Sequence, residues 1–450
     1  MKKNSALRSR LVFAVVLAAV TLWSPAAREL HIASDDREQM EVSRDVAGGR
    51  WGRLLEFHDQ VHLIPLFRLV RLPFDLHFPE RFHWMHAVAV AAHLASVVLL
   101  YRLSRRYLEE AGALAASALF ALNGLGAEAL IIKSQNTYVL SLPLVLGALL
   151  LLLGGRAAAA AGALAAGVGL HAETVLPAIP AVLISYYLLE GPREKRRAAW
   201  IACGAPLVMG GLAWAALGSP ELAAARASHS GVAARLWDGV WGAALHYGFL
   251  VRHEPPSGWV VAAGALGLAA ALAAARNRRL PAAGLALSAL PLVAILMLRG
   301  GAGYQTSRYC YQSFVAVALA AGAAVDRAAA TRFRTAAAAL LVALAPVYYL
   351  NQRSILQRKT ALLRFTPSVT REFWTGWAAF FDSLPPGFRL PAAEVEPGLW
   401  TPDIFALCNP KGRPGVTALG RREATAADCE NFRLQAAGRE ALRLSKTGCD

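Results

Sequence analysis

Apolar runs long enough to cross a bilayer recur along this chain, separated by short polar breaks. A helix needs roughly 20 apolar residues to span the hydrocarbon core, so such runs in series predict an all-α polytopic membrane protein. The composition agrees, because 56% of the 450 residues are hydrophobic, which is too many for a soluble protein of this size. We expect about eleven spans, near residues 10–27, 83–101, 111–131, 136–153, 157–170, 174–190, 198–217, 258–275, 280–298, 309–325 and 335–350.

The loop charges predict the orientation of these spans. Basic residues favour the cytoplasmic side, and four of them precede the first span. The loops that would then be cytoplasmic carry Arg102, Arg105, Arg106, Arg156, Arg193, Lys195, Arg196, Arg197, Arg276, Arg278, Arg279, Arg327, Arg332 and Arg334. The short external turns carry only Lys133, Arg299 and Arg308. We therefore expect a bacterial inner-membrane protein with a cytoplasmic N-terminus and, after an odd number of spans, a periplasmic C-terminal region.

The formal net charge of +16 does not indicate a nucleic-acid partner. Its basic residues are spread over short loops instead of forming one stripe, as topology signals do. The partners that this pattern predicts are membrane lipids, with no nucleic acid.

Two external loops and a tail complete the predicted organisation. Residues 1–350 form a transmembrane domain, in which loop 28–82 reads as short amphipathic helices on the membrane surface. Loop 218–257 carries interfacial aromatic residues. Residues 351–450 are polar and read as a small external α/β or irregular appendage.

The five cysteines form no CxxC pair, so they suggest no zinc site. Cys203 and Cys310 lie in apolar runs and read as packing residues. Cys408, Cys429 and Cys449 lie in the tail, where one disulfide is expected if the tail is outside the cytoplasm.

Several polar groups share the predicted outer face. Asp35 and Asp36 follow the first span, and Glu128 lies near the outer end of the third. His171 and Glu173 occupy the outer turn between the fifth and sixth spans, and Arg308 opens the tenth. A carboxylate at membrane depth is costly and normally faces a cavity or a partner, so these groups predict one outward-facing polar site.

Each group also has an ordinary interpretation. The aspartates and Glu173 read equally well as loop or turn acids, Glu128 as a partner of Lys133, and Arg308 as a headgroup anchor. The histidines read as interfacial residues in preference to metal ligands. They are His62, His83, His86 and His93.

The order of these elements resembles the GT-C superfamily of membrane glycosyltransferases, close to the protein O-mannosyltransferases and their bacterial relatives. The resemblance covers about residues 10–350. The matching elements are Asp35-Asp36, Pro65-Leu66, the helix from His83 to His93, Phe120-Ala121-Leu122 with Glu128, Glu173 with Pro177, and Arg308-Tyr309-Cys310-Tyr311.

The resemblance implies a polyprenyl-phosphate-linked sugar as donor and a glycan, lipid or protein hydroxyl as acceptor. Asp35 or Asp36 would be the catalytic base, and direct displacement would invert the anomeric centre. Arg308 would offset the phosphate charge, and Tyr309 and Tyr311 would bind the phosphate or line the lipid groove. Glu128 would orient the acceptor or, with Asp36, hold Mg²⁺ or Mn²⁺. His62, His171 and Glu173 complete the predicted substrate-binding set.

Two rival interpretations remain open. A transporter or flippase of a lipid-linked glycan would place charges near the bilayer midplane, on broken helices in related halves. The acids here gather at one face and no inverted repeat is visible, which favours the enzyme. An inactive scaffold of the same fold is the second rival.

Overall fold

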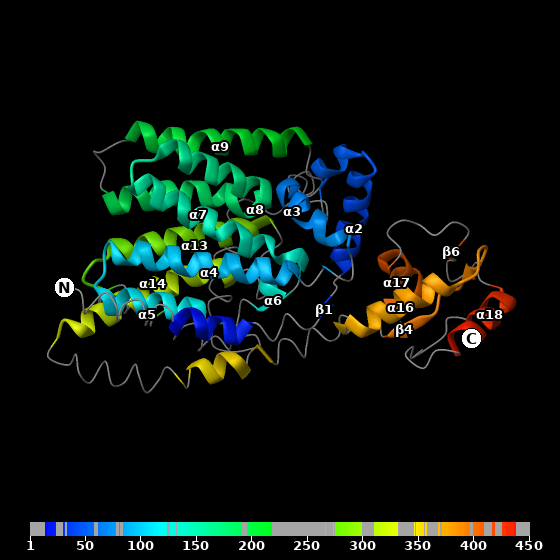
Figure 1. Ribbon diagram of the computed structural model, residues 1–450. Helices are drawn as coiled ribbons and strands as arrows, with labels where there is room; N and C mark the ends of the chain where they lie inside the picture. Colours follow the sequence, from blue (N-terminus) through cyan, green and yellow to red (C-terminus); the bar gives the residue numbers. More distant parts are fainter. Residues whose placement is uncertain are drawn as a thin grey trace.

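A computed structural model shows one bundle of long helices lying side by side (Figure 1). The bundle helices are α4 (Trp84–Arg105), α5 (Glu110–Ala121), α7 (Thr137–Leu153), α8 (Ala157–Glu190), α9 (Arg196–Leu217), α13 (Arg279–Leu298) and α14 (Cys310–Ala329). The structure describes residues 14–23, 30–57, 62–131, 133–190, 196–217, 275–298, 310–331, 346–357, 368–408 and 416–437, with shorter gaps inside several of these ranges.

Helix α8 is a hairpin with its bend at His171. The backbone there is extended, with φ −162° and ψ 86°. A Cβ on Gly167 would lie 3.1 Å from Cγ1 of Val175. Eight residues of straight helix would separate these positions by about 12 Å, so the two halves must fold back on each other. The predicted turn between the fifth and sixth spans is therefore present.

Within the described residues, three helices are long and apolar enough to cross a membrane, namely α4, α8 and α9. Shorter apolar helices are Ala14–Trp23, α5, α7 and the first part of α13. The all-α polytopic prediction is confirmed. The count of eleven stays a prediction, because the expected spans 258–275 and 335–350 and the loop 218–257 lie almost entirely outside the described residues.

Glycines allow α5 and α14 to cross closely. A Cβ on Gly112 would lie 2.6 Å from the carbonyl oxygen of Gly322, and a Cβ on Gly322 would lie 2.5 Å from that of Gly112. No side chain fits at such a contact. Small residues at a helix crossing are typical of membrane bundles, where close packing replaces the hydrophobic effect as the driving force.

Two histidines of α4 tie the bundle together through backbone carbonyls. The ring of His86 contacts the carbonyls of Trp23 and Leu130 at 3.0 and 3.2 Å. His93 donates from Nε2 to the carbonyl of Ala121 at 3.0 Å and accepts from the Tyr311 hydroxyl. Both rings are buried, which corrects our expectation that they are interfacial.

The first loop folds into three helices at one end of the bundle, where Figure 1 shows α2 and α3. They are α2 (Ser34–Ala47), the 3₁₀ helix η2 (Trp51–Leu55) and α3 (Pro65–Asp75). Pro65 sits in the first turn of α3, where its missing N–H costs nothing. The short elements α6 (Ala127–Ile131) and η4 (Lys133–Gln135) lie between α5 and α7 in the chain.

The tail forms a small α/β unit beyond the same end of the bundle (Figure 1). Its helices are α16 (Arg371–Ser383), α17 (Thr401–Cys408) and α18 (Ala426–Ala437). Its strands are β2 (Ser368–Val369), β3 (Arg389–Leu390), β4 (Glu394–Glu396), β5 (Leu399–Trp400) and β6 (Thr417–Ala418).

The tail unit has its own core and touches the first loop. Trp377, Phe380 and Phe381 pack together in that core. Strand β2 pairs antiparallel with β1 (Leu30–His31), a few residues before Asp35, and α17 contacts α2. Cys429 is in a disulfide.

Candidate active site

The aspartate pair lies in the first turn of α2, and Asp36 is fully buried. Its carboxylate accepts a hydrogen bond from Arg71 of α3 at 2.7 Å. The same guanidinium binds Asp75 one turn further along α3, at 3.1 Å. Ser43 of α2 donates to Asp75 at 2.8 Å. Arg71 therefore joins two carboxylates in a site that excludes water.

Lys133 of η4 adds a second cation to this group. It is buried, and η4 contacts α2. Burial lowers the pKa of Lys133 to about 8, while the nearby Asp36 carboxylate raises it and Arg71 lowers it. Burial alone lowers the pKa of Arg71, but Asp75 and Asp36 raise it above its ordinary value. We call Asp36, Arg71, Asp75 and Lys133 the aspartate cluster.

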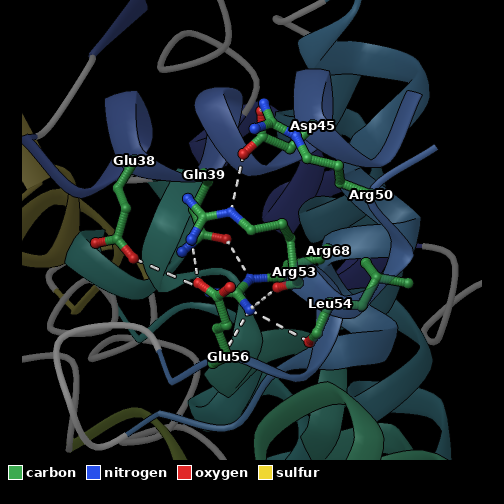
Figure 2. A network of polar contacts seen from close by, with 8 residues as sticks. All are labelled: Glu38, Gln39, Asp45, Arg50, Arg53, Leu54, Glu56 and Arg68. Atoms are coloured by element: carbon green, nitrogen blue, oxygen red, sulfur yellow. Dashed lines mark hydrogen bonds and ion pairs between the residues drawn. The ribbon is translucent and has the colours of Figure 1, made fainter. Parts of the chain in front are cut away.

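A second arginine of α3, Arg68, has a different environment, which Figure 2 shows. Its guanidinium donates to the carbonyls of Arg53, Leu54 and Glu56 at 2.8, 3.2 and 2.6 Å, and to the side chain of Gln39 at 3.2 Å. Burial lowers the pKa of Arg68 to about 10. These contacts fix the chain around η2 against α2 and α3.

A third group lies where the bend of α8 meets the chain before α3. His62 Nδ1 is 2.5 Å from Oε2 of Glu173 and 3.3 Å from Nε2 of His171. The ring of Tyr138 packs edge-on against His171, with centroids 4.5 Å apart. The structure therefore brings together three predicted substrate-binding residues, and it buries all three. For His62 this corrects the interfacial interpretation.

The other predicted residues have varied outcomes. The side chains of Asp35 and Glu128 lie outside the described residues, as do Arg308 and Tyr309 entirely. Tyr311 is buried beside His93 and Phe120. Its hydroxyl is hydrogen-bonded to His93. Its predicted contact with phosphate stays a prediction. The predicted Mg²⁺ or Mn²⁺ pair of Asp36 and Glu128 stays a prediction.

Sequence reasoning missed three members of the aspartate cluster, Arg71, Asp75 and Lys133. A signal for the first two was present, because positions i and i+4 share one face of a helix. Arginines within the apolar sequence of α3 also suggest buried partners. Lys133 carried no such signal, since an isolated lysine in a short turn is ordinary.

Known structures share this architecture. No protein-family model and no curated protein matches the chain. The structure of ArnT from Cupriavidus metallidurans bound to undecaprenyl phosphate is similar, with 13% identity and a TM-score of 0.52 over 96% of this chain and 89% of ArnT. ArnT is a GT-C glycosyltransferase.

This chain has the same fold as ArnT. The archaeal oligosaccharyltransferase AglB from Archaeoglobus fulgidus, in complex with an inhibitory peptide and a dolichol-phosphate, is also similar at 13% identity. Its TM-score is 0.45, and the match covers 85% of this chain but only 58% of AglB. The likeness to ArnT confirms the expected all-α polytopic fold class.

Proposed function

We propose that this protein is an integral-membrane glycosyltransferase that moves a sugar from a polyprenyl-phosphate donor to an acceptor hydroxyl at the periplasmic face. The observation that carries the proposal is the aspartate cluster, a buried charged group at one end of a GT-C bundle. Burying charged side chains is unfavourable, and a membrane bundle can fold without them. Two carboxylates buried together with two cationic side chains indicate a functional site.

The two aspartates have different roles in this proposal. Asp36 is fully buried and its carboxylate already accepts a hydrogen bond from Arg71, so an acceptor hydroxyl does not reach it. Asp36 therefore positions the start of α2 through Arg71. Asp35 is then the base that takes the proton from the acceptor hydroxyl. This assignment separates two residues that are equivalent in the sequence.

The reaction needs one base to take the proton of the acceptor hydroxyl and one cation to hold the phosphate that leaves. The acceptor oxygen forms a bond to the anomeric carbon while the bond from that carbon to the phosphate oxygen breaks. The hydroxyl proton goes to Asp35, and polyprenyl phosphate leaves as an anion. Arg308 remains our candidate for holding the phosphate, and the buried Lys133 of the aspartate cluster is a second candidate cation. Attack opposite the leaving group inverts the anomeric centre.

The proposed side of the membrane rests on two independent features. The arginine bias of the loops favours a cytoplasmic N-terminus. The disulfide of Cys429 favours an oxidising compartment for the tail, which lies at the same end of the bundle as the aspartate cluster. Both features support a periplasmic active site.

A bond-cleavage assay in proteoliposomes tests the proposal against the flippase rival. Radiolabelled polyprenyl-phosphate sugars are supplied with a panel of acceptors, and the lipid products are separated. We expect free polyprenyl phosphate to appear together with labelled acceptor. Transport of the intact lipid-linked sugar without cleavage would contradict the enzyme and support a flippase. Folded protein that shows neither activity would support the inactive scaffold.

A further inference from the structure

The group at the bend of α8 has the composition of a metal centre. Two imidazoles and one carboxylate meet there, all nearly inaccessible to solvent, and their ligand atoms lie within 4.8 Å of one another. In the described part of the chain, this is the group of three or more such side chains that is close enough to share an ion. We propose that His62, His171 and Glu173 bind one divalent transition-metal ion of the Zn²⁺ kind.

The distances fit a tetrahedral ion. With ligand bonds of 2.0–2.1 Å, two ligand atoms of tetrahedral Zn²⁺ lie about 3.3 Å apart. His62 Nδ1 and His171 Nε2 are 3.3 Å apart, and His171 Nε2 and Glu173 Oε2 are 3.8 Å apart. The pair His62 Nδ1 and Glu173 Oε2 is closer, at 2.5 Å, so these two atoms must move slightly apart when an ion binds between them.

The backbone at the bend is what allows two of the ligands to converge. On a continuous helix, residues two positions apart point about 200° away from each other, because each residue turns the helix by about 100°. The backbone leaves the helical path at His171, so the two side chains are not held on opposite faces of one helix. His171 and Glu173 can therefore reach the same point.

The third ligand is held in place from the opposite side. The amide of Ala172 donates to the carbonyl of Leu63 at 3.2 Å, which fixes the residue after His62 to the bend itself. Gly169 lets the start of α3 approach, because a Cβ there would lie 3.1 Å from Cβ of Leu66. An ion at this point would join the α8 hairpin to the segment that leads into α3.

Thr174 sets the imidazole tautomer of His171. The Thr174 hydroxyl donates to the His171 carbonyl at 3.3 Å, so its oxygen is left to accept from Nδ1–H of the ring at 2.8 Å. With the proton on Nδ1, the lone pair of Nε2 faces His62 and Glu173. In most metal-bound histidines, the ring nitrogen that does not bind the metal donates a hydrogen bond in this way.

The ligand set selects the class of ion. Imidazole nitrogen suits Zn²⁺ and its first-row neighbours, whereas Mg²⁺ and Mn²⁺ prefer carboxylate, carbonyl and water oxygens. This site therefore differs in both residues and ion from the Mg²⁺ or Mn²⁺ expected from the sequence. Three protein ligands leave one tetrahedral position for an oxygen ligand. The inference concerns binding alone and does not rest on the proposed transfer activity.

Metal titration of the purified full-length protein tests the site. The protein is stripped with a chelator, and Zn²⁺ and Co²⁺ are added while bound metal, the tetrahedral Co²⁺ absorption and thermal unfolding are followed. We expect one equivalent of Zn²⁺ and a higher Tm when it is bound. His171→Ala should lose both, and Thr174→Val should bind about 10–100-fold more weakly. His77→Ala removes an exposed histidine outside the group and should bind as the wild type does.

The opposite result identifies a metal-free pair. If folded wild-type protein takes up no more Zn²⁺ than a His62→Ala/His171→Ala variant, the group is a hydrogen-bonded histidine–glutamate pair and the proposal is wrong. Tighter binding of Mg²⁺ than of Zn²⁺ would also overturn it. If His171→Ala does not fold, Glu173→Gln and Thr174→Val decide, because both keep the local volume. Loss of transfer with metal still bound would bear on the proposed function alone.

Discussion

Arg68 and Arg71 lie one turn apart on α3 and are both buried, yet they bind different partners. Arg68 donates to three backbone carbonyls around η2, and the acid nearest it, Glu38, is 4.0 Å away. Arg71 contacts two fully buried carboxylates instead. Arg68 therefore satisfies backbone carbonyls of a loop, whereas Arg71 forms buried ion pairs.

The difference shows which arginine belongs to the fold and which to the site. Every residue has a backbone carbonyl, so the contacts of Arg68 to the loop do not depend on which side chains the loop carries. Arg71 needs Asp36 and Asp75, and both of these need Arg71, because an unpaired buried charge is costly. We infer that the loop around Arg68 is scaffold and that the aspartate cluster is functional.

Replacing Arg71 should have the largest effect on stability. Arg71→Met leaves Asp36 and Asp75 buried without the guanidinium that binds both of them, which costs about 3–5 kcal/mol. Thermal unfolding in detergent measures this loss. A drop no larger than that of Arg68→Met would contradict the distinction between the two arginines.

Replacing Arg68 should have a smaller and more local effect. Arg68→Met removes hydrogen bonds to carbonyls that water partly replaces, at a cost of about 1–3 kcal/mol. Limited proteolysis should show faster cleavage near residues 51–57, and sugar transfer should persist in the folded variant. Loss of transfer with the loop still protected would place Arg68 in the site.

The pH dependence of stability should report Lys133. Its pKa is about 8 in the folded protein and near the ordinary value for lysine when unfolded, so the folded state binds fewer protons between these values. Stability should therefore rise as pH increases from 8 towards 10. The charged groups facing Lys133 are Asp36 and Arg71, and the titratable ring of His86 also lies near it. Lys133→Met should flatten this rise, and an unchanged profile would show that Lys133 titrates normally.

The ion pairs at the rim of the Arg68 network should matter least. Asp45 accepts from Arg50 and Arg53, but Arg50 is largely exposed, and exposed pairs contribute at most about 1 kcal/mol. Asp45→Asn should shift Tm only slightly, and less in high salt. A shift as large as that of Arg68→Met would mean that the rim holds the loop.

The sequence predicted what depends on local patterns. Apolar run length predicted the long helices of the bundle, and the polar residues His171 and Glu173 predicted the turn that is now the bend in α8. Local sequence patterns did not predict the tertiary contacts. The meeting of His62 with Glu173 depends on one extended residue and on the hydrogen bond from Ala172 to Leu63, neither of which leaves a sequence signal. The burial of Lys133 likewise follows from the packing of η4 against α2.

The most direct test of the central claim is sugar transfer by Asp35→Asn beside Asp36→Asn and the wild type, with thermal unfolding measured on each. We predict that Asp35→Asn loses about 10³-fold in turnover with an unchanged Tm, since it removes the base. Asp36→Asn should lower Tm, because Arg71 loses a partner. Turnover of Asp35→Asn within about tenfold of the wild type would contradict the account, since general-base catalysis contributes at least about 10².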